Sequence, residues 1–166
     1  MCGIAGKISF SEKNISAQEI ETMNNAIKHR GPDDGGVYIS PDHKVGLGHR
    51  RLSIIDLSPL GHQPMRYLDR YEIVFNGEIY NFQEKRAMLE QEGYTFTSHS
   101  DTEVILALYE KYQEKCLDHL RGMFAFVIYD EHKQTLFCAR DRVGNNPFKY
   151  YIDDNVVLFA SELKAI

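Results

Sequence analysis

The sequence has few cysteines, no tryptophan and no long apolar run. Its three cysteines, Cys2, Cys116 and Cys138, are odd in number and not spaced for a metal site or a disulfide framework. The longest apolar run, Met123 to Tyr129, is far shorter than the roughly 20 residues of a membrane span. Basic residues are not in excess, since 19 Lys and Arg stand against 24 Asp and Glu. We therefore expect no membrane span, no general nucleic-acid binding and a reduced, cytoplasmic chain.

The rest of the composition is that of one ordinary globular domain. The chain has 166 residues, of which 43% are apolar and 26% charged, and its formal charge is −5. A chain of this length buries roughly two thirds of its unfolded surface and needs no disulfide to fold. We see no linker, repeat or low-complexity tract, and we expect a single domain over residues 1–166.

Three segments predict helices. A capping box, Ser16 with Glu19, begins the first, and its apolar face carries three residues at helical spacing. The second covers about 82–92 and stops at Gly93, and the third begins at a second capping box, Ser100 with Glu103. The apolar positions are Ile20, Met23 and Ile27 in the first helix and Val104, Leu108 and Tyr112 in the third.

Short β-rich runs fill most of the remaining chain. Two of them, 123–130 and 135–141, are joined by four residues and predict an antiparallel hairpin. Several runs are apolar on both faces, so an antiparallel sheet built from them needs cover on both sides. We therefore predict an α+β fold, a four-layer α/β/β/α sandwich of two stacked antiparallel sheets. The predicted strands are 4–10, 36–40, 45–52, 71–75, 123–130, 135–141 and 156–160.

Two places carry residues suited to acyl chemistry. If Met1 is removed, Cys2 carries a thiol and a free α-amine whose ordinary pKa of about 8 suits a base near neutral pH. The alternative without a catalytic role is that Cys2 is simply a small buried side chain. Asn76 and Gly77 offer a side-chain amide beside a backbone N–H, a pairing that suits an oxyanion hole, although Asn-Gly is equally a hairpin-turn signal.

The charged residues at two further places each have a functional and a structural interpretation. The guanidinium of Arg50 or Arg51 could hold a carboxylate, or both could be solvated on a surface strand. Asp101 lies one residue after the predicted N-cap, where compensation of the helix dipole explains it equally well. The histidines His29, His49 and His62 show no metal-ligand pairing, and we expect no metal site.

Taken together, these residues resemble the glutaminase domain of the glutamine-hydrolysing asparagine synthetase family. That domain is a class II glutamine amidotransferase with the N-terminal-nucleophile hydrolase fold, itself an α/β/β/α sandwich. The matches cover nearly the whole chain in order. The matching segments are 1–6, 29–33, 48–57, 61–65, 75–81, 100–105, 120–126, 139–142 and 160–166.

The resemblance implies a role for each matched residue. Cys2 would be the nucleophile, and Asn76 with Gly77 the oxyanion hole. Arg51 would bind the α-carboxylate of L-glutamine, whereas Arg50 has no such role. The remaining implied contacts are Glu78 and Asp101 for the α-ammonium group and the backbone of Leu52, Ser53, Ile54 and Ile55 along the same pocket.

The resemblance also implies a partner. In the family an ATP-pyrophosphatase-type synthetase domain follows, in cis or trans, and we expect ATP and magnesium only there, with no cofactor in the glutaminase domain. No Ser-Gly-Gly-x-Asp-Ser loop for ATP occurs in this sequence. The segment 144–151 departs from the family's Gly-Ile-Lys-Pro-Leu-Tyr-Tyr, which leaves the ammonia acceptor open. The oligomeric state is open too, a homo-oligomer included.

Two functions therefore stand side by side. The first is a glutamine-hydrolysing enzyme that supplies ammonia to a synthetase. The second is a catalytically silent glutamine-binding or structural module, which would follow if Met1 were retained and blocked the α-amine of Cys2.

Overall fold

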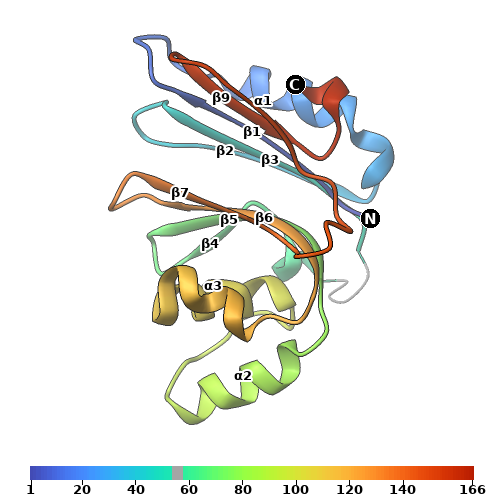
Figure 1. Ribbon diagram of the computed structural model, residues 1–166, viewed down its shortest axis with the longest axis vertical. Helices are drawn as coiled ribbons and strands as arrows, with labels where there is room; N and C mark the ends of the chain where they lie inside the picture. The colour runs from blue at the N-terminus through green and yellow to red at the C-terminus, as the bar shows by residue number, and fades with distance from the viewer. Residues whose placement is uncertain (54–57) are drawn as a thin grey trace.

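Two antiparallel sheets lie face to face, and helices cover the outer side of each (Figure 1). This computed structural model describes residues 1–53 and 58–166. The predicted four-layer α/β/β/α sandwich is confirmed. Both chain termini lie beside the first sheet, and the amino terminus reaches one end of the sandwich (Figure 1).

The first sheet has the order β2-β3-β1-β9-β8, and its neighbouring strands pair antiparallel. Its centre is β1, which pairs with β3 on one side and β9 on the other. The strands are β1 (Gly3–Ser9), β2 (Asp34–Ile39), β3 (Val45–Arg51), β8 (Lys149–Ile152) and β9 (Val156–Ala160).

The second sheet has the order β4-β5-β6-β7, with β5 and β6 paired along nine residues each. The predicted hairpin is confirmed as β6 and β7. The strands are β4 (Met65–Tyr67), β5 (Tyr71–Ile79), β6 (Gly122–Asp130) and β7 (Thr135–Arg140).

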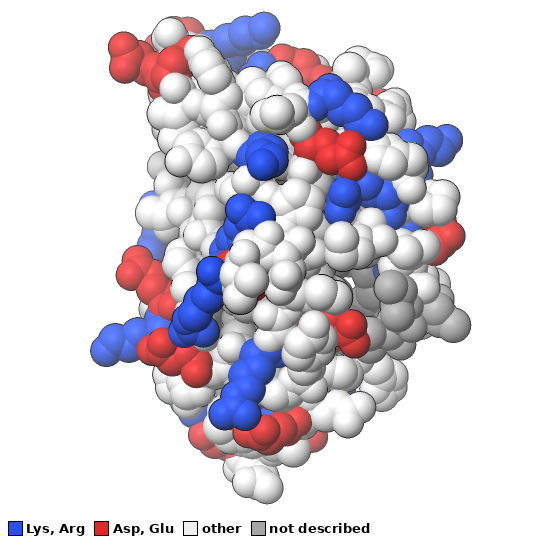
Figure 2. Space-filling model, turned by 45° about the vertical axis from the view of Figure 1, so that its right-hand side comes forward, with Lys and Arg blue, Asp and Glu red and all other residues white. Residues whose placement is uncertain are grey.

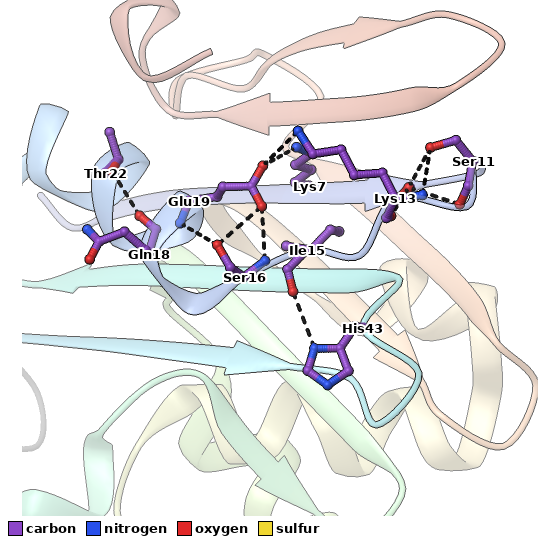
Figure 3. Close-up of polar contacts among 10 residues, drawn as sticks. Lys7, Ser11, Lys13, Ile15, Ser16, Gln18, Glu19, Thr22 and His43 are labelled. Carbon is purple, nitrogen blue, oxygen red and sulfur yellow. Dashed lines mark hydrogen bonds and ion pairs between the residues drawn. The ribbon is translucent and has the colours of Figure 1, made fainter.

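The first predicted helix is confirmed as α1 (Ala17–Ala26), with its complete capping box. The Ser16 hydroxyl accepts from the Glu19 amide at 3.3 Å, and the Glu19 carboxylate accepts from the Ser16 amide at 2.9 Å (Figure 3). The same carboxylate binds Lys7 Nζ of β1 at 2.6 Å, which ties the start of the helix to the central strand (Figure 3). In β3, Gly48 lets the helix come close, because a Cβ there would lie 2.5 Å from Asn24 Oδ1.

The helices α2 (Phe82–Gln91) and α3 (Asp101–Tyr112) cover the second sheet. Figure 1 shows α3 beside the sheet and α2 outside α3. This arrangement buries α3 on nearly all sides from Asp101 to Tyr109, rather than along a single stripe as its sequence pattern predicts. Short 3-10 helices span Lys28–Arg30, Pro59–Gly61, Gln113–His119 and Leu163–Ala165.

Apolar side chains fill all three spaces between the layers. The space between the sheets holds Ile4, Leu47, Val74, Val127 and Phe159, among others. A larger cluster joins the second sheet to α2 and α3, and a small one joins α1 to the first sheet. Burial on both faces explains why several strands show no polar alternation.

Three local predictions need correction. Asn76 and Gly77 do not form a hairpin turn, because β5 continues through them to Ile79. The strands β4 and β8 were not predicted. Ser161, which resembles a helix N-cap because Leu163 and Ile166 follow it at helical spacing, does not cap a helix. Its buried hydroxyl accepts from the Ile4 amide at 3.0 Å, and the short helix that follows has Glu162 at its N-cap position.

The surface carries both signs of charge. On the face shown in Figure 2, basic side chains are interspersed with acidic ones. Within the described part of the chain, no helix is long and apolar enough to cross a bilayer.

Candidate active site

A pocket lies at the end of the sandwich where the amino terminus, the end of β3, the second half of β5 and the start of α3 meet. Segments far apart in the sequence thus supply one site. It is lined by Met1, Cys2, Arg51, Leu52, Gly61, Gln63, Phe75, Asn76, Gly77, Glu78, Ser100, Asp101, Thr102 and Met123. Seven of the ten residues expected at the site are in this lining.

The Cys2 thiol lies against the backbone of Leu52. Its sulfur accepts from the Leu52 amide at 3.3 Å and lies 3.5 Å from the Leu52 carbonyl oxygen. Burial raises the pKa of the thiol, while the Leu52 backbone and the positive charges of the amino terminus and Arg51 act in the opposite direction. The sulfur is therefore held mainly as a thiol, and a nucleophilic reaction needs a base beside it.

Asn76 is fully buried, yet its side-chain amide makes no hydrogen bond with any described residue. Neither Nδ2 nor Oδ1 has a hydrogen-bond partner among residues 1–53 and 58–166. Leaving a buried amide unpaired costs about 1–3 kcal/mol, so such groups are rare in folded proteins. Because this amide also lines the pocket, a ligand oxygen is a natural partner for its N–H groups.

Gly77 places a backbone N–H on the same side of the pocket. The Phe75 amide donates to Gln63 Oε1 at 2.7 Å, and the Phe75 carbonyl lies 3.0 Å from His49 Nε2, so both face the edge of β5 away from β6. Strand alternation turns the Gly77 N–H toward that same edge. A side chain is impossible here, because a Cβ would lie 2.2 Å from the Met123 carbonyl oxygen.

Two carboxyl groups also line the pocket. Asp101, at the start of α3, is 4% exposed and accepts from the Ile79 amide at 3.0 Å. Burial raises its pKa to about 6, with a further contribution from the charge of Glu78. Glu78 also lines the pocket but is exposed. A bound cation would stabilise the ionised form of Asp101 and lower its pKa.

The two neighbouring arginines point to different environments. Arg51 lines the pocket and is buried, and its Nη1 donates to the Ser58 carbonyl at 3.0 Å. Arg50 donates from Nε to the Gly31 carbonyl at 3.0 Å and lies over Gly35. Strand alternation separates the two side chains, so the pattern of β3 selects Arg51 as the arginine of the site.

Among the described residues that were expected at the site, Ser53 is not part of this lining. Ser53 uses its amide to bind the Asp33 carboxylate at 2.9 Å. Ile54 and Ile55 lie outside the described residues. Leu52 lines the pocket and its amide contacts the Cys2 sulfur, and its role in binding substrate stays a prediction.

No functional role was predicted for Gln63 and His49, although both lie in segments that match the family. Gln63 is buried between the Phe75 amide and the Thr102 hydroxyl, and His49 is fully buried against the Phe75 carbonyl. Burial lowers the pKa of His49 to about 3, so it stays neutral and donates from Nε2 to that carbonyl. Both side chains form hydrogen bonds with the Phe75 backbone and so hold β5 in position just before Asn76.

The described chain contains no cluster of three or more His, Cys, Asp or Glu side chains that could hold a metal ion. The groups gathered in the pocket are instead a thiol, an amide, a guanidinium and two carboxylates. This set can attack a carbonyl carbon, stabilise the resulting oxyanion and bind a small zwitterion.

Comparison with known proteins supports this chemistry. A family model described as a glutamine amidotransferase domain matches residues 1–166. The chain is 49% identical to a putative glutamine-hydrolysing asparagine synthetase of Methanocaldococcus jannaschii and 43% identical to a glutamine-hydrolysing asparagine synthetase of Bacillus subtilis. Both matches cover 100% of this chain but 35% and 27% of those proteins. The chain thus spans about a third of the length of such relatives.

The fold has solved counterparts as well. The glutamine phosphoribosylpyrophosphate amidotransferase of B. subtilis, solved with ADP and GMP, superposes with a TM-score of 0.83 over 99% of this chain and 42% of that one. The sequence identity is 21%, so this likeness concerns the fold. The sequence resemblance to the amidotransferase family is confirmed by the matches in sequence.

Proposed function

Because this chain belongs to the glutamine amidotransferase domain family, we propose that it hydrolyses the side-chain amide of L-glutamine to glutamate and ammonia. The observation that carries the proposal is the buried Asn76 amide, which lines the pocket with Cys2 and has no partner within the described chain. A substrate carbonyl that becomes an oxyanion would supply that partner.

The reaction begins once Met1 has been removed and Cys2 has a free α-amine. Met1 is 51% exposed, which leaves the first peptide bond accessible. The α-amine takes the thiol proton as sulfur bonds to the amide carbon, and the carbonyl oxygen becomes an oxyanion between Asn76 and the Gly77 N–H. The carbon–nitrogen bond then breaks, and the α-ammonium returns its proton to the departing ammonia.

A glutamyl thioester on Cys2 remains after ammonia leaves. Water adds to its carbonyl through a second oxyanion at the same donors, with the α-amine as the base. Cleavage of the carbon–sulfur bond releases glutamate and restores the thiol. No electron transfer occurs in either half, and we propose that this domain needs no metal or cofactor.

Substrate recognition rests on the charges around the pocket. Free glutamine is a zwitterion, and the guanidinium of Arg51 suits its α-carboxylate as a planar donor. Asp101, assisted by Glu78, suits its α-ammonium group. A ligand that lacks either charge would lose one of these two charge-assisted contacts, which gives discrimination against simple amides.

We further propose that the ammonia serves an ATP-dependent synthetase domain, in cis or trans, in the reducing environment of the cytoplasm. The much longer relatives named asparagine synthetases support this partner. ATP and magnesium would act in that second domain, and aspartate is the proposed acceptor. If Met1 were retained, its peptide bond would abolish the basic amine, and the chain would be a silent glutamine-binding module.

The test is a glutaminase assay on the purified 166-residue chain. We expect glutamate and ammonia in equal amounts, no asparagine with aspartate, ATP and magnesium present, and a rate that ATP and aspartate do not change. Cys2→Ala should abolish turnover, whereas Cys138→Ala, which changes an exposed thiol in β7, should not. Substantial turnover by Cys2→Ala would refute the mechanism, and enzyme-dependent asparagine would refute the division between two domains.

A further inference from the structure

Asn146 is a second fully buried asparagine next to the site. It lies in the turn between β7 and β8, about 70 residues from Asn76 in sequence, and is 0% exposed. Its Nδ2 donates to the Asn76 backbone carbonyl at 2.9 Å. Because that carbonyl can only accept, the orientation of the Asn146 amide is fixed by its partner.

The turn that carries Asn146 is firmly attached to the second sheet. The buried Asp141 carboxylate accepts from the amides of Asn145 at 3.0 Å, Asn146 at 3.2 Å and Phe124 at 3.2 Å. Arg140 Nε donates to the Asn146 carbonyl at 2.6 Å. Phe124 is the β6 residue paired with Gly77, so the same carboxylate connects Asn146 with the strand beside the oxyanion donors.

The peptide that Asn146 binds is the one that carries the proposed oxyanion donor. The Asn76 carbonyl and the Gly77 N–H belong to one planar unit and point in opposite directions. Alternation along β5 places the carbonyl toward β6 and the N–H toward the pocket. The pairing with β6 already sets the direction of this peptide, and the Asn146 donor restrains it further and increases the polarity of the N–H, because hydrogen bonds in a chain polarise one another.

We propose that Asn146 is a positioning residue for glutamine hydrolysis, which orients and polarises the Asn76–Gly77 peptide so that the Gly77 N–H is directed at the oxyanion. This inference rests on the proposed glutaminase function. Asn146 itself does not touch the substrate and acts through the backbone that it binds.

The test compares Asn146→Leu and Asn146→Ala with the matched control Asn145→Leu. Both changes at 146 remove the Nδ2 donor, one with an apolar side chain of similar size and one by truncation. Asn145 is exposed in the same turn, so its replacement keeps the backbone contacts of the turn. We expect kcat to fall about 5- to 50-fold for both Asn146 variants, with less than about a threefold change in KM, and no change for Asn145→Leu.

A second readout separates positioning from general damage to the site. Alkylation of Cys2 by iodoacetamide forms no tetrahedral oxyanion, so its rate should stay within about twofold of the wild-type rate. Acylation of the same thiol by glutamine, measured in a single turnover, should slow as much as kcat. Inhibition by glutamate, which reports binding without an oxyanion, should be unchanged.

Each outcome decides the assignment. Unchanged kcat in both Asn146 variants overturns it, and so does an equal loss of acylation, alkylation and glutamate binding, which indicates a merely structural role. If one variant fails to fold, the other gives the same comparison. A wild-type chain that is inert with glutamine refutes the proposed function, and the role of Asn146 with it, whereas an active wild type with insensitive variants refutes only the role of Asn146.

Discussion

The two ends of the β5–β6 strand pair hold buried polar side chains with different hydrogen-bond partners. At one end, the buried Asp130 carboxylate binds Arg70 through two hydrogen bonds of 2.9 and 2.7 Å, and Glu72 binds Arg66 at 2.9 Å. At the other end, Asn76 has no side-chain partner in residues 1–53 and 58–166.

The difference also appears in the acidity of the two buried aspartates. Burial acts to raise the pKa of Asp130, but Arg70 and nearby backbone amides outweigh it, so the pKa is lowered. Burial dominates at Asp101 and raises its pKa to about 6. The Asp130 carboxylate thus has a guanidinium partner within the chain, whereas a bound cation would offset the effect of burial at Asp101.

Replacing Asn76 should have the largest effect and the most selective one. Asn76→Ala removes a proposed oxyanion donor, and we expect kcat to fall about 10²- to 10³-fold, with a much smaller change in KM. Because the Asn76 side chain makes no hydrogen bond with any described residue, the free energy of unfolding should fall only by the small cost of the cavity. Steady-state kinetics and urea unfolding measure the two effects, and a loss of stability without a loss of kcat would contradict the assignment.

Asp101→Asn should affect binding and pH dependence. We expect KM for glutamine to rise at least about tenfold, since the ammonium group loses its buried counter-charge. In the wild type, kcat/KM should fall as the pH drops below about 6, where Asp101 becomes protonated, and this inflection should be absent from the variant.

The same residue should alter stability in a defined pH window. A carboxyl group whose pKa is raised on folding loses stability as the pH rises from its unfolded value, about 3.9, through its folded value. Asp101→Asn should therefore be more stable than the wild type at pH 7 and equally stable near pH 3.5, as urea unfolding at the two values can measure. Equal stability at both values would mean that burial does not penalise this carboxylate.

Arg70→Ala, at the opposite end, should affect stability alone. It leaves Asp130 buried without its guanidinium, which we expect to cost about 1–3 kcal/mol, because Arg70 is partly exposed and two backbone amides still bind the carboxylate. Since the wild-type pKa of Asp130 is lowered, this loss should be present at pH 7 and disappear as the pH falls below about 4. A changed kcat would show that the two ends are not independent.

The sequence predicted the layers of the sandwich better than the edge strands of its sheets. The capping box at Ser16, the N-cap at Ser100 and Gly93 placed the ends of the helices, and the apolar runs that lack alternation required cover on both faces. The predicted capping box of Ser100 is incomplete, because the Glu103 carboxylate accepts from the Thr97 and Ser98 amides instead. The exposed strand β8 carries Tyr150, Tyr151 and Ile152 at the edge of its sheet, where no core imposes a pattern. Ser161 looked like a helix cap because the sequence cannot reveal its contact with Ile4, which lies far away in the chain.

For the site, the sequence identified residue types, and the fold selected between interpretations. Strand alternation separates Arg51 from Arg50, and the continuation of β5 decides against a turn at Asn76. The roles of Gln63, His49 and Asn146 could not be predicted, because each depends on a contact with the backbone of β5 from a distant segment. Segment 144–151, which departs from the family pattern, proves to contact the site through Asn146.

The intact mass of the wild-type chain, acid-quenched during turnover of glutamine, tests the account most directly. We predict a chain that lacks Met1 and carries one added glutamyl group, located on Cys2 by peptide mapping and absent from Cys2→Ala. Turnover by a chain that retains Met1, or a glutamyl group on any other residue, would contradict the account.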